Sequence, residues 1–130
     1  MSNPLIRPLP DCPLDIVGDI HGEIDALQSL LCHLGYDENG NHPERRRLVF
    51  VGDFVDRGVD SPATVRCIQK LTEQGHLAIL GNHELNLLHG DQKDGAGWFF
   101  ERQREREKHR YLQYMTMTLR GLPSMNQPNR

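Results

Sequence analysis

Three short polar blocks, each following an apolar, β-prone run, carry side chains suited to metal and phosphate chemistry. The blocks occupy residues 18–22 (GDIHG), 52–58 (GDFVDRG) and 81–84 (GNHE). Continuous apolar runs are typical of strands buried on both faces of a parallel sheet. Because open α/β sheets bind ligands beyond the carboxyl ends of their strands, we expect the blocks to meet at one rim. The side chains expected there are Asp19, His21, Asp53, Asp56, Arg57, Asn82 and His83.

The oxygen and nitrogen donors in these blocks suit divalent cations. Asp19 and His21 lie two residues apart, so an extended segment places a carboxylate and an imidazole on the same side. Asp53 offers two oxygens that could bridge two metals, and Asn82 adds a neutral carbonyl oxygen. Hard cations prefer carboxylate oxygen, whereas Mn, Fe and Zn also accept imidazole nitrogen. The residue types therefore indicate a metal site with mixed ligands.

The remaining polar side chains suit a phosphate ester. The planar guanidinium of Arg57 can grip phosphate through two hydrogen bonds. His83 could donate a proton to a leaving group, with Asp56 orienting its ring. With the metal ligands, these are the parts of two-metal phosphoester hydrolysis. Each motif alone has a structural alternative, since Asp-x-His occurs in ordinary turns, and Asp53 and Asp56 could cap the following helix.

The three motifs, in this order, resemble the GDxHG, GDxVDRG and GNHE signatures of the calcineurin-like metallophosphoesterases. The resemblance covers residues 14–88 and is to the serine/threonine phosphoprotein phosphatase branch, which includes symmetrical diadenosine tetraphosphatases. It implies an α/β/β/α sandwich fold and a metal-activated hydroxide that hydrolyses a phosphoprotein or a dinucleoside polyphosphate. Protein phosphatases of this branch often carry arginine just before GNHE, whereas this chain has Leu80, which favours bacterial polyphosphatase-like members.

The resemblance also implies two divalent ions of the Mn, Fe or Zn type as cofactors. The first ion would be bound by Asp19, His21 and Asp53. The second would share Asp53 and would also be bound by Asn82.

For catalysis, the resemblance implies that His83 is the general acid and that Asp56 is its partner. It assigns phosphate binding to Arg57 and to Asn82.

The family site also uses histidines from a second half of the sandwich, and these are missing here. After His83 the chain has only His89 and His109, and neither follows an apolar strand. We therefore expect the N-terminal half of a phosphoesterase. Its second metal site would be incomplete.

The composition fits one globular domain and lacks the basic excess of a nucleic-acid binder. The chain has 130 residues, a formal net charge of -3, 37% hydrophobic residues and 25% charged residues. Its cysteines form no CxxC pair, and Cys32 and Cys67 are expected as small buried hydrophobes in a reducing compartment. Because no apolar stretch reads as a signal peptide or a membrane span, we expect a cytoplasmic protein without membrane contact.

The apolar pattern predicts an α/β fold of order β-α-β-α-β with parallel strands. Strands are expected at 14–17, 48–51 and 77–80. The spacing predicts helices over 24–34 and from Ser61, each ended by a glycine, and Ser61 is expected to cap the second helix. A further short helix is expected over 84–88, followed by an apolar anchor at 98–100 and a charged helix from 101.

Domain boundaries follow from proline content and polarity. Prolines at 4, 8, 10 and 13 predict an extended leader over 1–13. We expect the partial phosphoesterase domain over 14–123 and a disordered tail over 124–130. The arginines at 45–47 could form a phosphate patch, but a solvated strand entry is the favoured interpretation. The charged segment 101–110 could contact nucleic acid, but its interleaved charges favour a solvated helix face.

Two functional hypotheses remain open at this level. The chain is a metal-dependent phosphoesterase acting on a phosphorylated substrate, or it is a truncated, catalytically weak module that binds phosphate or metal. Lacking a second sheet, it should expose one apolar sheet face, through which it would pair with itself or with a complementary chain.

Overall fold

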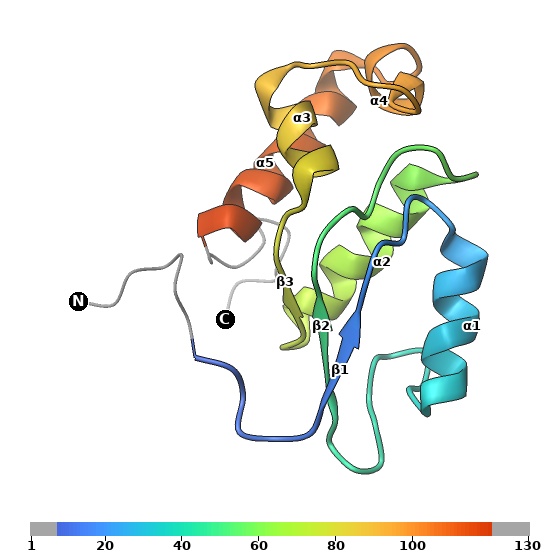
Figure 1. Ribbon diagram of the computed structural model, residues 1–130, viewed down its shortest axis with the longest axis vertical. Helices are drawn as coiled ribbons and strands as arrows, with labels where there is room; N and C mark the ends of the chain where they lie inside the picture. The colour runs from blue at the N-terminus through green and yellow to red at the C-terminus, as the bar shows by residue number, and fades with distance from the viewer. Residues whose placement is uncertain (1–7, 121–130) are drawn as a thin grey trace.

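The computed structural model describes residues 8–120. Its elements in chain order are β1 (Leu14–Val17), α1 (Ile24–Leu34), β2 (Arg47–Phe50), α2 (Ser61–Glu73), β3 (Leu77–Ala78), α3 (Asn82–His89), α4 (Gly97–Phe100) and α5 (Glu105–Arg120). The strands form one parallel sheet in the order β1-β2-β3 (Figure 1). The predicted α/β class and β-α-β-α-β order are confirmed.

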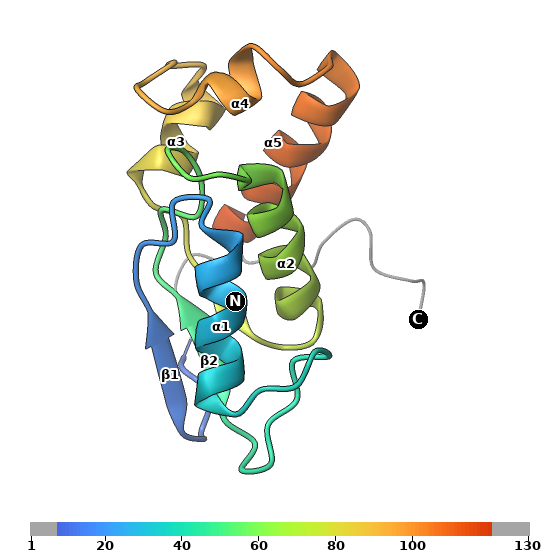
Figure 2. The same cartoon turned by 90° about the vertical axis from the view of Figure 1, so that its right-hand side faces the viewer.

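One face of the sheet forms the floor of the core. Its side chains alternate with those of the other face, and Val17, Leu48, Phe50 and Ala78 are all buried. Helices α1 and α2 lie on this side of the strands, as Figures 1 and 2 show from perpendicular directions. Burial of this apolar face is the main force that holds the two connecting helices on the sheet.

The opposite face of the sheet, which we call the open face, is also apolar. Backbone bonds from Val51 to Val17 and from Ile79 to Phe50 extend the ladder beyond the strands. The side chains on this face are Leu14, Ile16, Val49, Val51, Leu77 and Ile79. Ile16 is 60% exposed, Ile79 55% and Val51 40%, whereas Figures 1 and 2 show α1 and α2 on the other side of the sheet. Parallel sheets normally bury both faces, so this surface is unusual.

Helices α3, α4 and α5 form a second layer of apolar packing beyond the sheet. They contribute Leu87, Trp98, Phe99, Tyr111 and Met115 to the core. Figures 1 and 2 place α3 and α4 at the end toward which β1 points, so this layer borders the polar blocks. The predicted apolar anchor at 98–100 is confirmed for Trp98 and Phe99, which are buried.

The start of α2 corrects the predicted cap. The side chain of Asp60 accepts a hydrogen bond from the Ala63 amide at 3.0 Å, so Asp60 is the N-cap. Ser61 instead accepts from the backbone amide of Asp56 at 3.0 Å. Neither Asp53 nor Asp56 caps the helix, which leaves both carboxylates for other contacts.

Several predicted boundaries also change. β3 ends at Ala78 rather than residue 80. Beyond it, the backbone of Gly81 lies directly against Gly52, so close that a Cβ atom added at Gly52 would lie 2.5 Å from the Gly81 nitrogen. α3 begins at Asn82 rather than residue 84, and α5 begins at Glu105 rather than residue 101.

Other expectations concern single residues and the ends of the chain. Cys32 is exposed, not buried as expected, and Cys67 is only partly buried. Residues 8–13 carry no helix or strand, and the predicted tail at 124–130 lies outside the described residues. Within residues 8–120, no helix is both long and apolar enough to cross a membrane.

A buried histidine, His76, joins β2 to the loop that follows α1. Its Nδ1 accepts from the Leu48 amide at 3.0 Å, and its Nε2 donates to the Gly40 carbonyl at 2.8 Å. Because an amide can only donate and a carbonyl can only accept, these partners require the neutral ring. Burial correspondingly lowers the pKa of His76 from its ordinary value of 6.5.

Stability should therefore fall on mild acidification. The unfolded chain takes up a proton at His76 below its ordinary pKa of 6.5 while the folded chain does not, so the free energy of unfolding declines until the lowered folded pKa is reached. Urea unfolding between about pH 5.5 and about pH 7.5 should show a slope of up to about 1.4 kcal/mol per pH unit. A His76→Gln variant should be less stable but lose this slope; an unchanged slope would contradict the assignment.

Candidate active site

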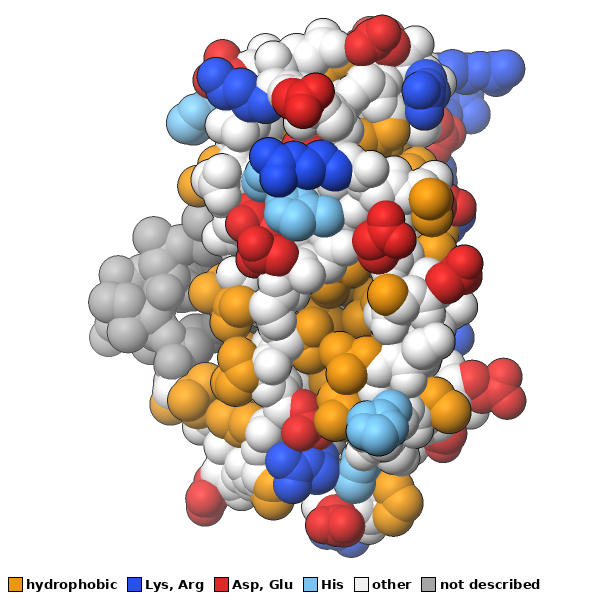
Figure 3. All heavy atoms as spheres, turned by 45° about the vertical axis from the view of Figure 1, so that its right-hand side comes forward, with side chains coloured by type: hydrophobic (Ala, Val, Ile, Leu, Met, Phe, Trp, Pro, Cys, Tyr) orange, Lys and Arg blue, Asp and Glu red, His pale blue; other side chains and the backbone are white. Residues whose placement is uncertain are grey.

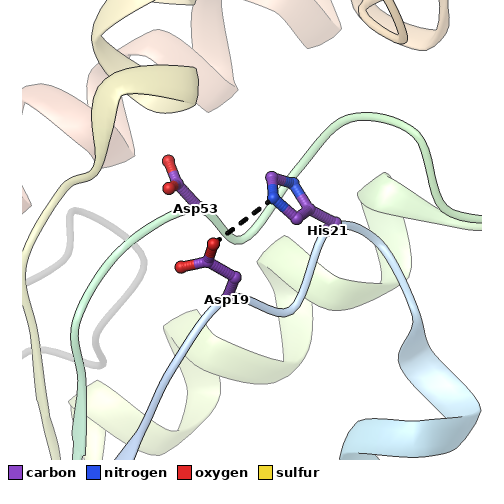
Figure 4. A group of neighbouring side chains, drawn as sticks. All are labelled: Asp19, His21 and Asp53. Carbon is purple, nitrogen blue, oxygen red and sulfur yellow. Dashed lines mark ion pairs between the residues drawn. The ribbon is translucent and has the colours of Figure 1, made fainter.

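Asp19, His21 and Asp53 come together at the carboxyl ends of β1 and β2. One ligand atom from each lies within 4.8 Å of the other two, and among the described residues they form the cluster of histidine and carboxylate groups that could hold a metal. Figure 4 shows Asp19 and His21 in the turn after β1, facing Asp53 in the turn after β2. The structure therefore places together the three residues that the sequence suggested as ligands of a first metal.

The hydrogen bonds of His21 determine which ring nitrogen is available. Its Nδ1 lies 3.0 Å from the carbonyl oxygen of Val55, which can only accept, so Nδ1 carries the hydrogen. Its Nε2 keeps a lone pair and lies 3.7 Å from Asp19 Oδ2. Metal-binding histidines are commonly held in this way, with the second nitrogen donating to a carbonyl. Two carboxylates and one imidazole therefore fit a cation of the Mn, Fe or Zn type.

The third block approaches Asp53 from the start of α3. The Asn82 side-chain amide faces the Asp53 carboxylate. With its nitrogen on this side it donates to the two carboxylate oxygens at 3.0 and 3.2 Å, and with its oxygen on this side it can share a cation with Asp53. The backbone amide of His83 donates to Asp53 Oδ1 at 3.1 Å. Asp53 thus contacts residues of the third block, and the two blocks meet at one rim as predicted.

His83 and Asp56 form a buried pair beside this cluster. His83 Nδ1 lies 2.9 Å from Asp56 Oδ2, and the Asp56 side chain is completely buried. The second oxygen of Asp56 accepts from the indole nitrogen of Trp98 at 2.7 Å. The ring of His83 packs edge-on against His21, with 4.6 Å between the ring centroids. The predicted pair therefore adjoins the candidate metal ligands, and Trp98 is a contact that the sequence did not reveal.

Four residues of the site adopt the left-handed backbone conformation, which side chains other than glycine rarely tolerate. Their φ angles are 48° at His21, 54° at Asp53, 74° at Asp56 and 76° at Arg57. Each such residue costs on the order of 1–3 kcal/mol and persists only where surrounding contacts hold it. Strained backbone of this kind is concentrated at functional sites.

Arg57 extends from this strained turn toward solvent. Its backbone amide donates to the Gly95 carbonyl at 3.2 Å, while its side chain is exposed. Figure 3 shows basic, acidic and histidine side chains gathered on one face, above a patch of hydrophobic ones.

The carboxylate of Glu84 binds the backbone of the turn that contains the second block. This buried carboxylate accepts from the amides of Gly81 at 2.9 Å, Asp53 at 2.7 Å, Phe54 at 2.8 Å and Val55 at 3.3 Å. Burial raises the pKa of Glu84, and these four hydrogen bonds oppose the rise. Glu84 belongs to the GNHE motif, but the motif alone predicted no role for it. Its position three residues after the N-cap Gly81 was the available signal, since a glutamate there reaches back to the cap.

Other candidate residues are not brought to this rim. His89 lies at the end of α3 and His109 within α5, and neither joins the ligand cluster among the described residues. Two of the three arginines proposed as an alternative phosphate patch, Arg46 and Arg47, have side chains that contact protein groups. Arg46 pairs with Asp15 at 3.0 Å, which lowers the pKa of Asp15, and Arg47 donates to the Gln74 carbonyl.

Comparison with known proteins gives a consistent family. A family model described as calcineurin-like phosphoesterase matches residues 12–126. An asymmetrical bis(5'-nucleosyl)-tetraphosphatase of Oceanobacillus iheyensis is 34% identical over 119 residues, which are 89% of this chain and 44% of that protein. A symmetrical bis(5'-nucleosyl)-tetraphosphatase of Shewanella oneidensis is 44% identical over 79 residues, covering 59% of this chain and 27% of that protein.

A solved structure agrees. A crystal structure described as that of a diadenosine tetraphosphatase matches with a TM-score of 0.59 and 32% identity, over 80% of this chain and 44% of that one. The chain thus spans less than half the length of these relatives.

Replacing Glu84 by glutamine should loosen the site and destabilise the chain. Glutamine offers one accepting oxygen, and its amide group would face backbone donors, so we expect a loss of about 2–4 kcal/mol in the free energy of unfolding. Urea unfolding measures this loss, and Mn²⁺ titration should show weaker binding because Asp53 loses its support. The exposed Glu105→Gln is the matched control and should change neither property. Wild-type stability in Glu84→Gln would show that the four hydrogen bonds contribute little.

Proposed function

The chain belongs to the calcineurin-like phosphoesterase family, and from this premise we propose that it is a metal-dependent hydrolase of phosphate esters. One observation carries the proposal: the candidate ligands Asp19, His21 and Asp53 adjoin the buried His83–Asp56 pair at a single rim. A ligand cluster beside an oriented histidine is the arrangement that phosphoester hydrolysis requires.

The proposed cofactors are two divalent ions. Asp19, His21 and Asp53 would hold the first, while Asp53 and Asn82 would hold the second, which has fewer ligands in this chain. When bound, such ions neutralise phosphoryl oxygens and lower the pKa of the attacking water. Manganese is the ion we would test first, and the three free cysteines agree with a reducing, cytoplasmic location.

The chain's own residues would bind the ester and move a proton. Arg57 extends into solvent from the rim and would hold phosphate oxygens together with Asn82. Because His83 Nδ1 is engaged by Asp56, Nε2 is the nitrogen left to protonate the departing oxygen. Asp56 would keep the ring in this orientation and stabilise its positive charge.

For the substrate we propose a dinucleoside polyphosphate over a phosphoprotein. Both support the same chemistry, but the relatives described above are bis(5'-nucleosyl)-tetraphosphatases. The other hypothesis, a phosphate- or metal-binding module without catalysis, keeps the same residues and differs in turnover.

The test is hydrolysis by the purified chain with added Mn²⁺, using p-nitrophenyl phosphate, diadenosine tetraphosphate and a phosphopeptide. We expect turnover, fastest with the dinucleotide, and a loss of at least about a hundredfold in Asp53→Asn, because that change removes the shared ligand. Circular dichroism would confirm that the variant is folded. A folded wild-type chain that binds Mn²⁺ but hydrolyses nothing would support the binding-module hypothesis instead.

We further propose that the open face binds a second copy of this chain. Among the described strand residues, this face carries six aliphatic side chains and one charged side chain, that of Arg47 at the start of the central strand β2. A charged partner would therefore find little to pair with, whereas an identical face supplies matching apolar surface. Two such sheets can pack about 10 Å apart in a two-fold sandwich.

Charges placed on the open face should prevent this association. We expect sedimentation velocity to show a concentration-dependent dimer for the natural chain and a monomer for Ile16→Asp and Ile79→Asp. Val59→Asp, which changes an exposed apolar residue outside the sheet, is the control and should still dimerise. A monomeric natural chain that binds no apolar dye would refute the proposal.

A further inference from the structure

The Asp56 carboxylate has two buried partners, and only one of them is part of the proposed chemistry. His83 Nδ1 forms a hydrogen bond with Oδ2 at 2.9 Å, and the indole nitrogen of Trp98 donates to Oδ1 at 2.7 Å. All three side chains are buried. An indole N–H can only donate, so the direction of this bond is unambiguous.

Trp98 is itself held in place by packing. Its ring contacts Phe99 and Tyr111 edge-on, with centroids 5.6 and 5.4 Å away. Three residues earlier, the Gly95 carbonyl accepts from the Arg57 amide, so the segment 95–98 contacts both Asp56 and Arg57. These are the two consecutive residues with left-handed backbone, at φ 74° and 76°.

We infer that Trp98 is a positioning residue for the general acid. A buried carboxylate with a free oxygen can rotate or draw in water, and either change would turn Oδ2 away from His83. The indole bond fixes the carboxylate plane, and the carboxylate in turn fixes the His83 ring. This inference rests on the proposed function and adds a residue from α4, 42 positions along the chain, to that machinery.

The hydrogen bond can be tested without any turnover. The chain has one tryptophan, so its indole N–H gives a single resonance in a ¹H–¹⁵N spectrum. We expect slow exchange of this proton with solvent in the unchanged chain, and a clear shift of the resonance in Asp56→Asn. Rapid exchange, or a resonance that does not respond to Asp56→Asn in a folded variant, would overturn the inference while leaving the proposed function in place.

The catalytic consequence is tested with Trp98→Phe, which keeps an aromatic ring but removes the donor. Poor leaving groups need a proton from the general acid and good ones hardly do, because the general acid typically supplies 10²–10⁴-fold only where protonation limits the rate. We expect turnover of an alkyl phosphate to fall about tenfold or more and that of p-nitrophenyl phosphate less than about threefold.

Phe99→Leu is the matched control, since it disturbs the packing around Trp98 without touching its donor. It should affect both substrates equally. An equal loss for both substrates in Trp98→Phe would reveal a purely structural role and overturn the inference. Absence of turnover in the unchanged, metal-loaded chain would overturn the proposed function and the catalytic part of the inference together.

Discussion

The geometry of the rim depends on the hydrogen bonds that the Glu84 carboxylate accepts from backbone amides. The carboxylate binds three consecutive amides of the turn after β2 and one amide before α3. Without it, four backbone amides would lose their acceptor, and those of Phe54 and Val55 are buried. Each buried donor left unsatisfied costs about 1–3 kcal/mol. By joining two turns that are 30 residues apart, one side chain fixes Asp53 against Asn82 and His83. The chemistry of the site therefore depends on a residue that faces away from solvent.

The sheet and the helices contribute differently to the site around Glu84. The parallel strands carry the blocks to one edge, and the buried face of Val17, Phe50 and Ala78 keeps α1 and α2 behind them. The layer formed by α3, α4 and α5 packs beside Asp56, whose side chain is completely buried. Position comes from the sheet, and orientation comes from the helical layer.

Sequence reasoning predicted the parts that depend on local pattern. Apolar runs ending in glycine and carboxylate gave the strands and the meeting of Asp19, His21 and Asp53, because parallel strands necessarily end at one edge. It missed contacts that depend on distant packing. Glu84 and Trp98 lie 31 and 42 residues from their partners. The local pattern marks Glu84 as a capping glutamate but does not reveal its bonds to the turn after β2, and nothing local shows that the Trp98 indole donates to Asp56. Cys32 was misplaced for a similar reason, since helical spacing does not decide how far a neighbouring element extends over a face.

The strained backbone also affects how the rim comes apart. Four residues with positive φ lie in two adjacent turns, and the contacts that hold them come from separate elements, α3 for Asp53 and the 95–98 segment for Asp56 and Arg57. When the contacts from α3 or from the 95–98 segment break, the turn that they hold can relax its strained backbone. The contacts of the neighbouring turn are then weakened as well. The rim should therefore behave as one cooperative unit whose amide protons exchange together, through an opening of lower free energy than unfolding of the sheet.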